Sequence, residues 1–126
     1  QEALMALSTV SLGFAAGATL FVDTAQAAAA VAVAVASKTI YQIEIDNSMN
    51  AAEDEYVKFY NTAGAVVVGT TVPDMVIEMR GSAKKSIVIP DGLLFQTGIA
   101  VATVTAGGTA GVTPPTAPIT VKIVYA

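Results

Sequence analysis

The sequence predicts an all-β fold, a single antiparallel β-sandwich of jelly-roll type whose N-terminal segment can extend as an arm. Most of the chain consists of short segments in which apolar and polar residues alternate at a period of two, as in half-buried strands. Clusters of Gly, Pro, Asn and Asp separate these segments at short spacings, as in tight connections between strands. Outside one Ala-rich run, no segment has the 3.6-residue apolar repeat of a helix.

The N-terminal residues 1–37 are expected to form an arm or the first strands, and residues 38–126 the β-sandwich core, within one domain overall. The stretch 3–22 is uncharged and has the length of a membrane span. No Lys or Arg precedes this stretch, and Ser, Thr and Gly residues dilute it. Strands with turns at Gly13 and Gly17 are therefore the favoured interpretation.

The Ala-rich run between residues 25 and 37 has the composition of a helix. However, Val31, Val33 and Val35 recur at every second residue, which places all three on one face of a strand. On a helix, Val33 would point away from the other two. We therefore expect a strand here, with the small Ala side chains packed closely against a neighbour.

The clearest alternation lies between residues 41 and 46, where Tyr41, Ile43 and Ile45 are expected to face the core of an antiparallel strand. Turn-forming residues predict a polar loop at 47–54 and a turn at 90–92. Residues 105–118, rich in Gly, Thr and Pro, are expected to form a long exposed loop. The other expected strands are 55–61 with Val57 and Phe59 inward and Lys58 outward, 65–68, 74–80 with Met75, Ile77 and Met79 on one face, 86–89, 93–97, 99–105 and 119–125.

The composition excludes several functional classes. The 126 residues include no Cys and no His, so disulfides, thiolate or imidazole metal sites and His-dependent catalysis are excluded. The net charge of −4 and the scattered bases argue against nucleic-acid binding. Hydrophobic residues make up 54% of the chain and aromatic residues only 6%, so small apolar side chains predominate. This excess suggests burial against neighbouring proteins.

Two pairs of carboxylates have the spacing to share a strand face, namely Glu44 with Asp46 and Asp74 with Glu78. Acid–base catalysis by such a pair would require pKa values that differ from ordinary ones. Both pairs fall on polar, outward faces, and no nucleophile–base pair can be proposed. We therefore expect a protein that is not an enzyme and that has no cofactor.

The densest acidic cluster, in and beside the 47–54 loop, has oxygen ligands of the kind that bind Ca²⁺. An EF-hand loop starting at Asp46 fails, because its sixth and twelfth positions would be Ala51 and Val57. A solvated acidic loop is therefore favoured and no metal site is predicted. The candidate ligands, should a metal bind, are Asp46, Glu53, Asp54 and Glu55.

Four motifs between Lys38 and the end of the chain occur in a recognisable order. They are Tyr-Val-Lys-Phe-Tyr-Asn at 56–61, Val-Gly-Thr-Thr-Val-Pro at 68–73, Pro-Asp-Gly-Leu-Leu-Phe at 90–95 with Thr97-Gly98, and Gly-Gly-Thr-Ala-Gly at 107–111 with Pro114-Pro115. In this order the chain resembles small virion proteins of tailed phages, the β-sandwich capsid decoration (cement) proteins and related head- or tail-associated proteins. The first two motifs are the most specific part of the resemblance.

The resemblance implies a non-enzymatic bacteriophage structural protein on the capsid surface of the virion. Its partners would be the major capsid protein and further copies of itself in a homo-oligomer, with no nucleic acid and no membrane involved. Such a protein stabilises the shell and carries no catalytic residues. Three alternatives stay open: a phage tail, collar or fibre component, a pilin- or adhesin-like filament subunit that donates a strand through residues 1–37, and a binding module for glycans or calcium.

Overall fold

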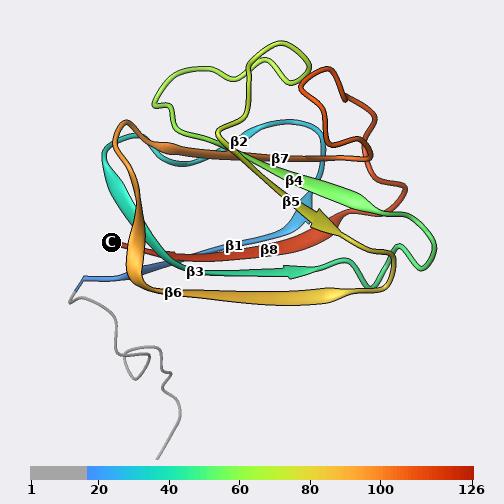
Figure 1. Cartoon of the computed structure of the whole chain (residues 1–126), viewed down its shortest axis with the longest axis horizontal. Coiled ribbons are helices and arrows are strands. Elements are labelled where there is room, and N and C mark those ends of the chain that lie inside the picture. Colours follow the sequence, from blue (N-terminus) through green and yellow to red (C-terminus); the bar gives the residue numbers. More distant parts are fainter. Residues whose placement is uncertain (1–16) are drawn as a thin grey trace, which may run out of the picture.

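The computed structural model describes residues 17–126, which form two antiparallel sheets of four strands packed face to face (Figure 1). The first sheet has the strand order β1-β8-β3-β6 and the second sheet the order β2-β7-β4-β5. The strands are β1 (Thr19–Gln26), β2 (Val31–Ala34), β3 (Lys38–Asp46), β4 (Glu55–Tyr60), β5 (Met75–Met79), β6 (Lys84–Phe95), β7 (Ile99–Val104) and β8 (Ile119–Tyr125). The all-β sandwich predicted from the sequence is confirmed.

The strand order is that of a jelly roll. Strand β1 pairs with β8, β2 with β7, β3 with β6 and β4 with β5, so the chain resembles a long hairpin wound into two sheets. Strands β1 and β2 belong to different sheets, and both pair within the same chain. Residues 19–34 thus supply the first strands of the sandwich. The earlier part of the expected arm, with the expected turn at Gly13, lies outside the described residues.

The core between the sheets consists of the inward side chains that the alternation predicted for most strands. Phe59 of β4 and Phe95 of β6 meet edge to face, with ring centroids 6.4 Å apart. The predicted inward faces of β5 and β8 are also confirmed. The buried core is formed by Ile40, Ile43, Ile45, Val57, Phe59, Ile77, Met79, Phe95, Ile99, Val101, Ile119, Val121 and Ile123.

The alternation did not predict a matched irregularity of β3 and β6. The register of β3 against β8 steps from Ile40 to Gln42, so that Ile40 rather than Tyr41 is buried in the core. Against the same step, β6 moves from Leu93 to Val88, and the residues between them form an excursion within one continuous strand. The predicted turn at 90–92 is therefore the tip of this excursion, and the two strands expected around it are one.

Gly92 at this tip has a φ of +79°, which favours glycine. A Cβ atom there would collide with the Thr39 side chain and lie 3.0 Å from the Tyr41 ring. Within residues 17–126, no helix has the length and apolar character needed to cross a bilayer.

Candidate interaction face

The two sheets differ in what covers their outer faces. The loop at 61–74 and the loop at 105–118 lie over the outer face of the second sheet (Figure 1). Beneath them, Tyr60, Ala100 and Ala102 form a second buried cluster, against which Val66 and Val68 pack. All six residues of β7 are buried as a result. The strand expected at 65–68 is part of this covering loop instead.

Lys58 holds the 105–118 loop against the second sheet. Its side chain points away from the core, as predicted, but the loop buries it completely. The ammonium Nζ donates hydrogen bonds to the carbonyl oxygens of Gly108, at 2.6 Å, and of Gly111, at 3.2 Å. Burial lowers the pKa of Lys58. The loop itself is largely exposed, as predicted, while two of its carbonyl groups accept hydrogen bonds from the buried ammonium group of Lys58.

Asn61 forms hydrogen bonds with two further connections of the second sheet, the segment just before β5 and the segment just before β7. Its Oδ1 accepts hydrogen bonds from the backbone N–H groups of Thr97, at 2.8 Å, and Gly98, at 3.4 Å. Its own N–H donates to Asp74 Oδ2 at 2.6 Å. Several residues that carry the sequence resemblance, including Lys58 and the 107–111 glycines, therefore have a structural role in covering the second sheet.

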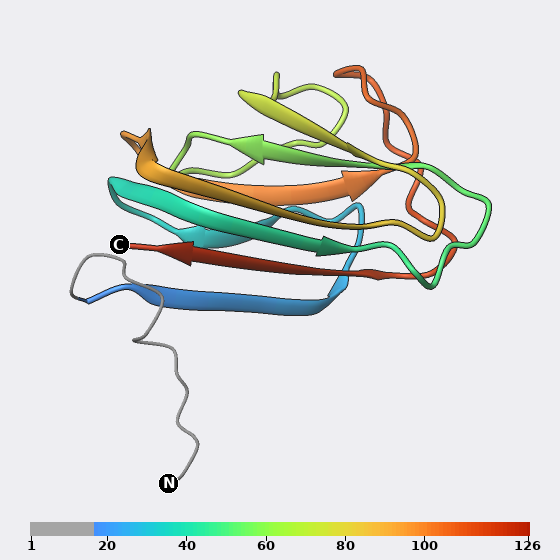
Figure 2. The ribbon, with the colours of Figure 1, turned by 60° about the horizontal axis from the view of Figure 1, so that its bottom comes forward.

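The outer face of the first sheet is crossed by no loop of the described chain (Figure 2). It exposes four large apolar side chains on its two outermost strands. Leu20 and Val22 of β1 are 51% and 47% exposed, and Val88 and Leu94 of β6 are 57% and 54% exposed. These side chains lie at the two edges of the sheet, and other exposed apolar side chains, including Val67, Val72 and Val112, lie in the loops over the second sheet. We refer to the outer face of the first sheet as the open face.

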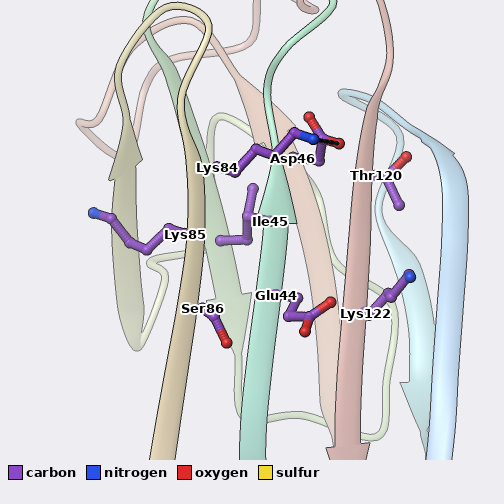
Figure 3. A pocket seen from close by; sticks show the side chains of 8 residues that line it. All are labelled: Glu44, Ile45, Asp46, Lys84, Lys85, Ser86, Thr120 and Lys122. Carbon is purple, nitrogen blue, oxygen red and sulfur yellow. Dashed lines mark ion pairs between the residues drawn. The ribbon is translucent and has the colours of Figure 1, made fainter.

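Charged residues lie toward one end of the open face, beside a hollow of about 450 Å³ (Figure 3). Lys84 Nζ lies 3.8 Å from Asp46 Oδ2. Hydrogen bonds from Ser48, and after them the charge of Lys84, hold the pKa of Asp46 below its usual value. Within residues 17–126, the side chain of Lys122 forms no ion pair or hydrogen bond. The hollow is lined by Glu44, Ile45, Asp46, Lys84, Lys85, Ser86, Thr120 and Lys122.

The four candidate metal ligands point to different partners. Asp46 belongs to the open face, whereas Asp54 Oδ1 accepts a hydrogen bond from the backbone of Gly81 at 2.9 Å. The two oxygens of Glu53 accept bonds from the backbone N–H and the hydroxyl of Thr116, at 2.8 and 2.9 Å. In the described part of the chain, no group of three or more carboxylates is arranged to hold a metal ion.

Glu55, the fourth candidate, is fully buried at the start of β4. With the side chain ionised, neither of its oxygens has a hydrogen-bond donor. Burial, the adjoining Glu53 carboxyl and the charge of Asp54 together raise the pKa of Glu55 to about 8. Protonated Glu55 can donate a hydrogen bond to the Glu53 carboxylate, which explains how the two acids coexist. The period-two pattern contained this signal, because Glu55 shares its face with Val57 and Phe59.

Asn47 and Asn50 organise the loops around this acid pair. Asn47 Nδ2 donates hydrogen bonds to the carbonyl oxygens of Glu53 and Arg80, both at 3.0 Å. Asn50 Nδ2 donates to Asn47 Oδ1 at 2.9 Å and to the carbonyl of Ala117 at 2.8 Å. Three loops are thus joined at one end of the sandwich, and the oxygen-rich segment serves to connect them.

The carboxylate pairs considered for catalysis lie on two different sheets. Glu44 and Asp46 share the open face. Asp74 accepts the Asn61 bond described above, and the carboxylate of Glu78 lies 3.7 Å from Arg80 Nε.

Comparisons with protein families, with curated proteins and with solved structures found no match for this chain.

Proposed function

We propose that the chain is a non-enzymatic structural protein of a phage virion, and that it acts as a capsid decoration protein. The observation that supports this most is the difference between the two sheets. Within residues 17–126, the second sheet is covered on both faces, whereas the first sheet leaves an apolar and charged face open. An uncovered sheet face with large apolar side chains along both edges is suited to burial against a protein.

A stabilising role follows from binding to the assembled shell alone. Any protein that binds the assembled state, and not the dissociated subunits, shifts the equilibrium toward assembly. The jelly-roll topology is in keeping with this role, since the fold is frequent in viral capsid proteins. Because the same fold also occurs in lectin domains, the proposal rests on the open face and not on the fold.

Strand donation through residues 1–37 receives less support. Residues 19–26 and 31–34 pair with β8 and β7 of their own chain. Donating these strands to a neighbour would require breaking that pairing and exposing core residues such as Ile123.

A mass-spectrometric inventory of purified particles, with heads and tails analysed separately, tests the proposal. We expect the chain in heads at high copy number. Confinement to tails would move the role to a tail, collar or fibre component, and absence from both fractions would refute a virion role.

The open face can be tested by the same measurement. Val22→Glu, at a half-exposed position of that face, should strongly reduce incorporation into particles. The matched control is Val72→Glu, which places the same charge at a position 70% exposed in the 61–74 loop. Equal loss for both variants would argue against the open face as the binding surface.

A further inference from the structure

The register of the first sheet arranges the outward side chains of the open face in rows across its four strands. In one row, Leu20 of β1 is followed by Val124, Gln42 and Val88. In the next row, Val22 is followed by Lys122, Glu44 and Ser86. The centre of the sheet is the seam between β8 and β3, with two strands on each side.

Residues on one side of this seam can pair with residues on the other side when a second copy of the sheet is placed over the first. A two-fold axis that runs along the strands, above the seam, would bring β8 of a second copy over β3 of the first. In that arrangement Lys122 faces Glu44 of the other copy, and Leu20 faces Val88 of the other copy. The charged pair and this apolar pair match, as an interface between identical surfaces requires, whereas Val22 faces Ser86 and Val124 faces Gln42 of the other copy.

We propose that two copies of this chain pair face to face through their open faces around this axis. The inference rests on the proposed function, in which the open face is a protein-binding surface, and it names a second copy as the partner that covers this face while the chain is free of the shell. Lys122 lies opposite Glu44 of its own chain in the register of β8 and β3 but forms no ion pair with it within residues 17–126, and Glu44 of the second copy is a further counter-charge in the dimer. Asp46 and Lys84 already neutralise each other, so the dimer buries no unmatched charge from this pair.

The size of the face sets the strength of the association. Four strands about 4.8 Å apart and seven residues long give a footprint of roughly 450 Å² per copy. Two such footprints, at roughly 900 Å², lie near the lower limit for specific interfaces. We therefore expect a weak dimer with a dissociation constant of roughly tens to hundreds of micromolar. Two aligned sheets would pack about 10 Å apart with their side chains interleaved.

Sedimentation equilibrium of the full chain, from micromolar to near-millimolar concentration, tests the proposal. We expect the average mass to rise from 12.7 kDa toward twice that value. Lys122→Glu should weaken association by about tenfold or more, because the new carboxylate would face Glu44 of the other copy. The two-fold axis makes this repulsive contact occur twice in each dimer. Glu44→Lys alone should do the same, and the double variant Lys122→Glu/Glu44→Lys should restore association. Arg80→Glu, which reverses an exposed cation on the opposite sheet, is the matched control.

A chain that stays monomeric throughout this range overturns the inference. So does a dimer that Lys122→Glu and Arg80→Glu affect equally, or one that the double variant fails to restore. Far-ultraviolet circular dichroism checks that each variant is folded. A monomer found in phage heads would leave the proposed function intact, whereas a charge-sensitive dimer absent from particles would leave the pairing intact and refute that function.

Discussion

Replacing Glu55 by Gln should remove most of the pH dependence of this protein's stability between about pH 4.5 and pH 8. The side chain of Glu55 is fully buried and, when ionised, has no hydrogen-bond donor. Its pKa in the folded protein is about 8, against an ordinary value of 4.5. Between these pH values the folded protein retains a proton that the unfolded chain releases, so the free energy of unfolding falls as the pH rises.

The size of the effect follows from the two pKa values. A difference between about 8 and 4.5, at about 1.4 kcal/mol per pH unit, corresponds to a loss on the order of 5 kcal/mol across the window. This is a large fraction of the 5–15 kcal/mol that is typical of a folded domain. The lowered pKa of Glu53 acts in the opposite direction, but its contribution is lost only as the pH falls below about 4.5.

Urea denaturation followed by circular dichroism, at several pH values from 5 to 9, measures the effect. The wild-type protein should lose stability steadily toward pH 8, whereas Glu55→Gln should change little and become the more stable protein above pH 8. Glu44→Gln, which removes an exposed carboxylate from the open face, should leave the wild-type slope intact. A wild-type stability that is flat or rises across this window would refute the assignment of a buried, protonated Glu55.

Two further substitutions test the covering of the second sheet. Lys58→Met should destabilise the fold by about 2 kcal/mol, because the carbonyls of Gly108 and Gly111 lose a charged donor, and the 105–118 amides should exchange faster with solvent; unchanged exchange in that loop would contradict its attachment by Lys58. Asn61→Ala should cost about 1–3 kcal/mol, since the N–H groups of Thr97 and Gly98 lose their acceptor. Thr70→Ala, at an exposed position of the same loop, serves as its control, and equal losses of stability for the two variants would contradict the role given to Asn61.

Local sequence patterns predict most of this fold, because the alternation of apolar and polar residues along a strand indicates which side chains face the core. The alternation at Met75, Ile77 and Met79 and that at Ile119, Val121 and Ile123 gave the correct inward faces. The step at Tyr41 was not predictable in this way. It depends on a matching excursion in β6, more than 40 residues later in the chain. The alternation of residues within one strand does not include the effect of such a distant partner.

The open face was beyond sequence reasoning for a similar reason. Both sheets have polar outward residues, and the sequence does not say which sheet the loops will cover. Lys58 and Lys122 both occupy outward positions on strands, yet one is completely buried and the other exposed. The difference comes from a glycine-rich loop that begins about 50 residues after Lys58. The burial of Glu55, by contrast, could have been inferred from the sequence, because Glu55 shares its strand face with Val57 and Phe59.

The pairing of the first strand with the last governs when this fold can be completed. Strand β8 lies between β1 and β3, so the first sheet has no continuous hydrogen-bonded order until residues 119–125 are present. On the ribosome, β1 waits unpaired while about a hundred further residues are made, and contacts of such long range make folding slow. The innermost hairpin, β4 with β5, can form far earlier. A chain interrupted shortly before its end would therefore expose the edges of β1 and β3 together, which is a template for aggregation that the finished protein conceals.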